Sequence, residues 1–233
     1  MTEIARTIRQ HKGQIAVVAA LALSSAACTA MIAVRVLYTG RLHHVFLVWN
    51  LFLAWVPMVC AVAAYVLYAR KSVVSYLAIL PCAGIWLLFF PNAPYVMTDL
   101  IHLQPFDETL IWFDLVMILF FGWTALFLGF ASLYLMQDLV SRTLGNFAGW
   151  LFVFATFGLS GFGVYLGRIR GWNSWDVFYH PGSLLSDIWD RLRHPLAHQR
   201  TFAFSLLFAV FFLSAYFILF AFARLRPAAH EAS

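Results

Sequence analysis

The sequence predicts an all-α integral membrane protein, because of its composition and the way its apolar residues are distributed. Hydrophobic residues make up 63% of the 233 positions and charged residues only 11%, a balance not found in soluble domains of this size. The apolar residues gather into six windows that carry almost no charge, each about long enough to cross the roughly 30 Å hydrocarbon core as a helix. We therefore expect six transmembrane helices in a single domain over residues 1–233.

Each of the six spans is marked by its apolar window. The first follows three basic residues, but its apolar run is too long for the core of a cleaved signal peptide, so we expect this span to be retained. The third is the shortest and contains Pro81, which leaves a re-entrant segment as the alternative to a crossing. The expected spans are about 15–37, 45–68, 73–90, 110–136, 147–166 and 202–223.

The distribution of Lys and Arg gives the expected orientation. These residues divide almost evenly between the two sides of a six-span topology, eight against seven, so their count alone decides little. The segment between the third and fourth spans contains acidic residues but no Lys or Arg, which favours the side away from the cytoplasm. We therefore expect a cytoplasmic amino terminus.

The segment 90–102, which follows the third span, combines two prolines with a set of polar residues. Pro91 and Pro94 each disfavour a helix at the residue before, so we expect the third span to stop at Phe90 and a short helix to begin near Pro94. Along such a helix, at 100° per residue, an arc of about 100° carries all the polar side chains. They are Tyr95, Thr98, Asp99 and His102.

This polar stripe has two interpretations. It either faces water at the membrane edge, or faces inward and forms a site with Asn92 and Asp114. Asp99 and His102 are three residues apart and could share a proton or ligate one metal ion. A third ligand would have to come from Asp114, His43, His44 or His180. We therefore predict no metal site and no cofactor.

Two other polar stretches accompany it. Asn50 lies inside the second span, where a hydrogen bond to another helix is the favoured interpretation. The stretch 167–176 closes the fifth span with Arg168, Asn173 and Asp176, which suit interfacial anchoring and turn chemistry. If Arg168 or Arg170 pairs with Asp99 or Asp176, the result is a charged cluster able to hold an anion or a lipid head group.

The segment 184–193 has the pattern of a helix that lies on the membrane surface. Its apolar side chains fall on one face and its charged ones on the other. The expected partners are the lipid bilayer and anionic head groups, and the basic residues between apolar runs give no reason to expect nucleic acid. Small-residue steps at Ala125/Gly129 and Gly163/Gly167 allow close helix packing within one bundle or between copies in a homo-oligomer.

Three stretches together give a family resemblance: FPNAPY at 90–95 with Thr98, Asp99, Leu100 and His102, the stretch 49–57, and the stretch 167–176. In this order they resemble a bacterial multi-pass membrane family known only as a domain of unknown function. The resemblance implies a bacterial inner-membrane protein with several spans, and it supplies no activity.

Three classes of function follow. Binding or transport of a small solute or ion at the Pro91/Pro94 break ranks first, since interrupted helices often line membrane sites. The alternatives are an accessory or structural protein without a site, and a membrane-embedded hydrolase or transferase with Asp99 and His102 as catalytic candidates. The candidate ligand-binding residues are Asn50, Asn92, Tyr95, Thr98, Asp99, His102, Asp114, Arg168, Asn173 and Asp176.

Overall fold

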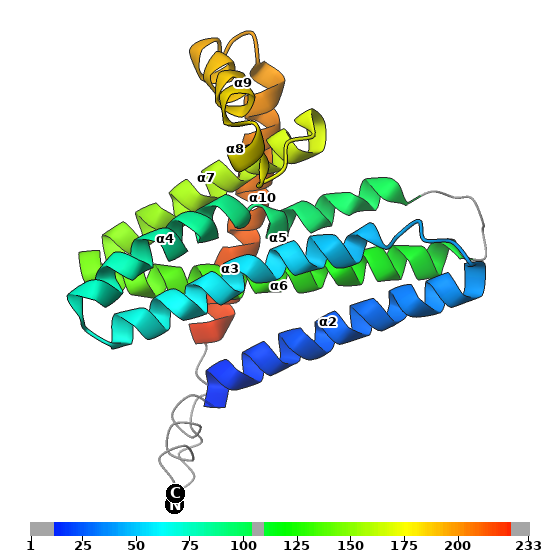
Figure 1. The fold of residues 1–233 in the computed structure, drawn as a ribbon, viewed down its shortest axis with the longest axis horizontal. Coiled ribbons are helices and arrows are strands. Elements are labelled where there is room, and N and C mark those ends of the chain that lie inside the picture. The colour runs from blue at the N-terminus through cyan, green and yellow to red at the C-terminus, as the bar shows by residue number, and fades with distance from the viewer. Residues whose placement is uncertain (1–11, 104–109, 225–233) are drawn as a thin grey trace, which may run out of the picture. The chain divides into compact units, whose positions relative to one another are not determined.

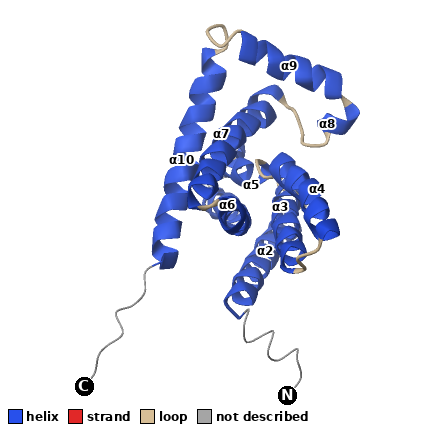
Figure 2. Cartoon of the chain, turned by 90° about the vertical axis from the view of Figure 1, so that its left-hand side faces the viewer, coloured by secondary structure: helices blue, strands red, loops and turns tan. Residues whose placement is uncertain are grey.

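The computed structural model describes residues 12–103 and 110–224, and every regular element within these ranges is a helix (Figures 1 and 2). The all-α prediction is therefore confirmed. The elements are α2 (Lys12–Thr39), α3 (Phe46–Ala69), α4 (Val73–Phe89), α5 (Asn92–Tyr95), the 3-10 helix η1 (Val96–His102), α6 (Ile111–Leu144), α7 (Asn146–Arg170), α8 (Asp176–Tyr179), α9 (Pro181–Arg193) and α10 (Gln199–Arg224).

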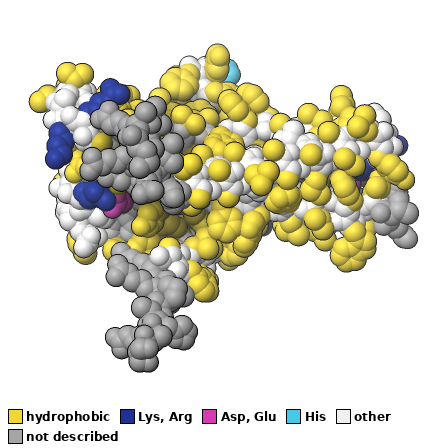
Figure 3. Space-filling view, turned by 90° about the horizontal axis from the view of Figure 1, so that it is seen from below, with side chains coloured by type: hydrophobic (Ala, Val, Ile, Leu, Met, Phe, Trp, Pro, Cys, Tyr) yellow, Lys and Arg dark blue, Asp and Glu magenta, His cyan; other side chains and the backbone are white. Residues whose placement is uncertain are grey.

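Six of the described helical stretches are long and apolar enough to cross a membrane, as predicted. They are Ile15–Thr39, Phe46–Ala69, Val73–His102, Ile111–Leu144, Asn146–Arg170 and Gln199–Ala223. The third of them joins α4, α5 and η1 into one apolar stretch of 30 residues. Hydrophobic side chains cover most of the face seen in Figure 3, a surface suited to lipid contact. The chain is a multi-pass membrane protein.

The chain forms two compact units, residues 1–136 and 137–233. The first unit holds α2 to α5, η1 and most of α6, and the second holds the end of α6 and α7 to α10. The single domain over residues 1–233 stays a prediction.

Polar side chains inside the first unit join helices across an apolar core. The Trp55 indole N–H donates to Ser25 Oγ at 3.0 Å, which links α3 to α2, and the Trp86 indole N–H donates to Ser132 Oγ at 3.2 Å, which links α4 to α6. Buried indoles need such an acceptor because an unpaired N–H is costly in an apolar interior. These hydrogen bonds hold α3 against α2 and α4 against α6.

A close approach between α5 and α6 completes the first unit. A Cβ atom built on Gly129 would lie 2.8 Å from the Ala93 Cβ, so glycine allows these two backbones to approach. Ala125, one turn before Gly129, is fully buried. The small-residue step Ala125/Gly129 thus packs inside the first unit.

The second unit is built on the pairing of α7 with α10, where glycine again permits close contact. A Cβ atom on Gly161 would overlap the backbone carbonyl of Ser205. Further along the same pair, the Trp150 and Phe217 rings stack with centroids 5.0 Å apart. The Tyr216 hydroxyl donates to Gln137 Oε1 at 2.6 Å, which joins α10 to the end of α6.

Candidate functional site

The break between α4 and the next helix is shorter than the sequence predicts. The helix ends at Phe89, and Phe90 and Pro91 keep right-handed helical dihedrals (φ −54°, ψ −40° and φ −59°, ψ −21°). The next helix begins at Asn92, two residues before the expected start at Pro94. Proline supplies no N–H but favours this φ, so the hydrogen-bond ladder is interrupted while the backbone keeps helical dihedrals. The Asn92 side-chain amide donates to the Phe89 carbonyl at 2.9 Å, one of the acceptors left at the helix end.

The short helix that follows is 3-10 over Val96–His102, and this changes which residues share a face. Residues three apart lie above one another in a 3-10 helix, so Val96, Asp99 and His102 form one line. Val96 and Asp99 are fully buried, whereas Ile101, on another line, is exposed. The predicted single stripe from Tyr95 to His102 assumed α-helical steps and is corrected here.

Asp99 is one of the most deeply buried carboxylates in the described chain, with 1% of its surface exposed. The Asn50 side-chain amide donates to Asp99 Oδ2 at 2.8 Å, which joins α3 to η1. A carboxylate inside an apolar bundle is costly unless donors meet it. The hydrogen bond that the sequence favoured for Asn50 is therefore present, and it lies on a candidate site residue.

A second buried acidic group, Asp114, lies one turn into α6 and pairs with Arg35 of α2. The guanidinium donates from Nε to Oδ1 at 2.6 Å and from Nη2 to Oδ2 at 2.9 Å, the bidentate geometry of a strong pair. Sequence reasoning proposed Asp114 and missed Arg35 as its partner. The sequence did contain an indication of this pair, because Arg35 lies inside an otherwise apolar first span, where an arginine usually has a partner.

His44, between α2 and α3, is only 7% exposed, and its Nε2 atom has no hydrogen-bond partner among the described residues. Its ring meets that of His43 edge-on, with centroids 4.9 Å apart. Burial lowers the pKa of His44 below its ordinary value; nearby Asp114 opposes the shift, whereas Arg35 and His102 add to it. The imidazole is therefore neutral near pH 7.

These groups converge at one end of the first unit. We call the set the first-unit polar cluster: Arg35, His44, Asn50, Asp99, His102 and Asp114. The His102 ring also packs edge-on against Phe46 at a centroid distance of 5.1 Å. Within residues 12–103 and 110–224, no three or more His, Cys, Asp or Glu side chains are grouped so that they could hold a metal ion. The residues of the cluster can form hydrogen bonds and ion pairs.

Other predicted site residues serve the backbone. The Thr98 hydroxyl donates to the Tyr95 carbonyl at 2.6 Å, and Tyr95 itself is half-buried. In the second unit, Asp176 Oδ2 accepts the Asn173 backbone N–H at 2.7 Å, which is the expected turn chemistry. Arg168 is half-buried near the end of α7.

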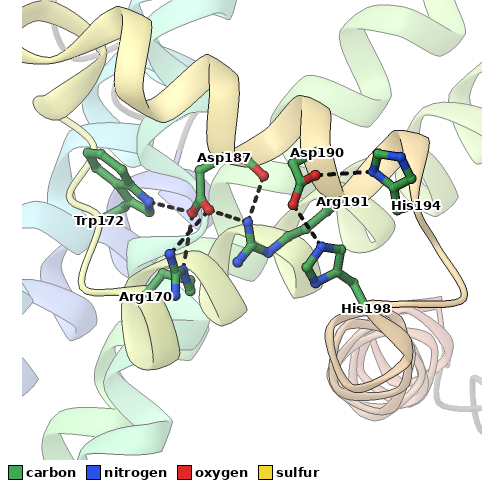
Figure 4. Close-up of polar contacts among 7 residues, drawn as sticks. All are labelled: Arg170, Trp172, Asp187, Asp190, Arg191, His194 and His198. Atoms are coloured by element: carbon green, nitrogen blue, oxygen red, sulfur yellow. Dashed lines mark hydrogen bonds and ion pairs between the residues drawn. The ribbon is translucent and has the colours of Figure 1, made fainter.

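The second unit has its own polar network, centred on Asp187 of α9 (Figure 4). Its carboxylate accepts both Nε and Nη2 of Arg170 at 3.2 Å, the Trp172 indole N–H at 2.8 Å, and Arg191. We call these four residues the Asp187 latch. Burial opposes ionisation, but the three donors outweigh it and hold the pKa of Asp187 below its ordinary value. The sequence left Asp99 and Asp176 as possible partners of Arg168 or Arg170, and in the structure Arg170 pairs with Asp187.

Residues 49–215 match a protein family described as "Protein of unknown function (DUF1361)". The chain belongs to this family. The DUF1361 match includes Asn50, Asp99, Asp114 and the Asp187 latch, whereas Arg35 and His44 precede it. A search of the curated proteins and a search of the solved structures each found no match.

Proposed function

We propose that this DUF1361 protein binds or transports a small polar solute or ion at the first-unit polar cluster, in the inner membrane of a bacterium and with a cytoplasmic amino terminus. The observation that carries the proposal is His44 Nε2, a buried nitrogen without a hydrogen-bond partner among the described residues. Leaving such a group unpaired costs about 1–3 kcal/mol. A bound solute that completes this hydrogen bond offsets that cost.

The surroundings of His44 favour a small polar ligand. Two buried carboxylates, Asp99 and Asp114, lie in helices that contribute to the cluster, and the Arg35 guanidinium already neutralises one of them. Neutral His44 supplies one further hydrogen bond, as donor or acceptor according to its tautomer. Asp99, which follows the helix break at Pro91, accepts a hydrogen bond from Asn50, and interrupted helices often carry solute sites in membrane proteins.

Ligand-dependent thermal unfolding tests the proposal. The purified protein is heated in detergent with sodium, potassium, magnesium, phosphate, and panels of amino acids and sugars, one at a time. A compound bound at 100 times its Kd stabilises by about 2.7 kcal/mol. We expect one compound to raise the Tm of the wild type but not that of Asp99→Asn or His44→Ala. Asp99→Asn keeps an oxygen acceptor for Asn50 and removes only the charge.

The matched control is Asp138→Asn, which alters a more exposed carboxylate of α6 that is paired with Arg142. The control should respond to the compound as the wild type does. The same compound should then enter proteoliposomes that contain the wild type, but not those that contain Asp99→Asn. If no compound separates Asp99→Asn from Asp138→Asn while both fold, the first-unit polar cluster is structural.

One observation favours a second candidate function, a membrane-embedded hydrolase or transferase. The 3-10 register puts Asp99 and His102 on one line of η1, an arrangement in which a carboxylate can orient an imidazole base. Hydrolysis of a chromogenic ester by the wild type and its loss in His102→Ala would select this candidate.

A further inference from the structure

The helix α9 divides its apolar residues between two adjacent faces. Leu184 is buried and Ile188 half-buried, and both pack in a cluster with Tyr165 and Leu166 at the end of α7. The next arc of the helix carries Leu185, Trp189 and Leu192, all more than half exposed. We call these last three residues the outer row.

Other apolar side chains close to α9 in the chain are also exposed. Phe178 and Tyr179 of α8 and Leu196 after α9 are each at least 70% exposed. Several exposed apolar side chains within one short stretch of chain favour contact with another molecule or a membrane.

The Asp187 latch fixes the direction in which the outer row points. Arg170 at the end of α7 and Trp172 after it donate to Asp187. Asp187 lies one helical turn after the buried Leu184. Arg191 donates to the same carboxylate, and its guanidinium carbon lies 5.8 Å from the centre of the Tyr165 ring. Because only 4% of Arg191 is exposed, α9 cannot roll about its axis without pulling a charge out of its pairing.

We propose that the lipid bilayer covers the outer row, with α9 lying in the membrane interface. The helix follows α7, a span that ends at Arg170, and precedes α10, a span that begins at Gln199, so it lies where two spans reach the membrane boundary (Figure 2). Arg193 lies over the Trp189 ring at 4.8 Å. An indole with an adjacent arginine suits the head-group level, where the ring meets lipid and the guanidinium meets phosphate.

The opposite face of α9 is polar and suits water. Asp190 accepts hydrogen bonds from His194 at 3.1 Å and His198 at 2.8 Å (Figure 4). Ser183 and Ser186 are exposed on the same side. A helix with one apolar and one charged face lies flat in the interface rather than crossing it.

Site-specific quenching by lipids tests the proposal. Cys28, Cys60 and Cys82 are replaced by Ala, and a single cysteine that carries a nitrobenzoxadiazole label is introduced as Leu185→Cys or Leu192→Cys. The matched controls are Ser183→Cys and Ser186→Cys on the same helix. In nanodiscs, lipids that carry a spin label near the top of the acyl chain should quench labels on the outer row at least about twofold more than labels on the serine side.

Three further results decide whether the proposal holds. Equal quenching on both faces would overturn the proposal. So would the formation of dimers by a short bismaleimide at Leu185→Cys without lipid quenching, because a second copy would then cover the row. Asp187→Ala in the labelled Leu185→Cys chain should reduce the difference between the faces, whereas Asp190→Ala should keep it. Because all four labelled positions are exposed, normal folding is expected, and a monodisperse elution profile verifies it.

Discussion

Asn50 donates from its side-chain amide to the Asp99 carboxylate at 2.8 Å, from α3 to a 3-10 segment 49 residues later in the chain. This contact ties the segment after the proline break to the second span. Asp99 lies in the 3-10 helix on the same line as the buried Val96, which is the line that faces the protein interior.

An exchange of the two residues tests this contact. Asn50→Asp places two carboxylates together and should destabilise the protein by several kcal/mol, since like charges in an apolar interior cannot both stay ionised cheaply. Adding Asp99→Asn restores an amide facing a carboxylate, so the double variant should regain most of the lost stability. The measurement is thermal unfolding in detergent. Additive losses in the double variant would mean that the two side chains do not interact.

The Arg35–Asp114 pair gives a second prediction. Both side chains are largely buried and bonded through two oxygens. Arg35→Ala leaves a buried carboxylate with one donor group fewer and should cost about 3–5 kcal/mol. Arg142→Ala, which breaks a more exposed pair with Asp138, should cost less than about 1 kcal/mol. Denaturation of both variants in the same detergent makes the comparison, and equal losses would contradict it.

Helix packing in the second unit predicts different effects for two glycines of α7. Gly161→Ala inserts a methyl group against the Ser205 backbone, which cannot move aside as a side chain can, and should destabilise by about 1–3 kcal/mol. Gly158→Ala meets no atom within 4 Å and should be neutral or stabilising by up to about 1 kcal/mol, since Ala is the better helix former. The measurement is the unfolding midpoint of each variant, and equal midpoints for Gly161→Ala and Gly158→Ala would contradict the prediction.

The pH dependence of α9 follows from Asp187. Its folded pKa lies below its ordinary value of 3.8, so the stabilisation is fully present above that value and is lost as the pH falls through the folded pKa. Limited proteolysis of residues 171–198 should therefore accelerate in the wild type as the pH falls below about 4. An acid-stable protease such as pepsin can be used over this range. Asp187→Asn should be cleaved faster already at pH 4 and show less change on further acidification.

Much of the fold could be predicted from the sequence because hydropathy is a local property. Each span is a continuous apolar window, so its position can be read without knowing its neighbours. The amphipathic segment that becomes α9 is visible for the same reason. Pro91 led us to expect the end of the third span at Phe90, one residue past the observed end of α4 at Phe89.

The site was harder to predict because it depends on contacts between distant residues. In the 3-10 helix over 96–102, each residue is rotated about 20° further from the one before than in an α-helix. The amino-acid composition of the segment does not indicate which of the two helices forms. Arg35 and Asp114 are 79 positions apart, and their pairing follows from the way α2 packs on α6. His44 stands out only once its burial is known, since a histidine beside His43 in a short loop is an ordinary polar residue in the sequence.

The position of Asn50 along α3 has a consequence for access. It is the fifth residue of that helix, so it lies about 6 Å along the axis from the helix start at Phe46. Further along α3, the side chains of Leu51, Ala54 and Met58 are buried in the apolar core of the first unit. Asn50 therefore lies near one end of α3, with buried side chains between it and the other end, so a solute that crossed the membrane past Asn50 would require this packing to open.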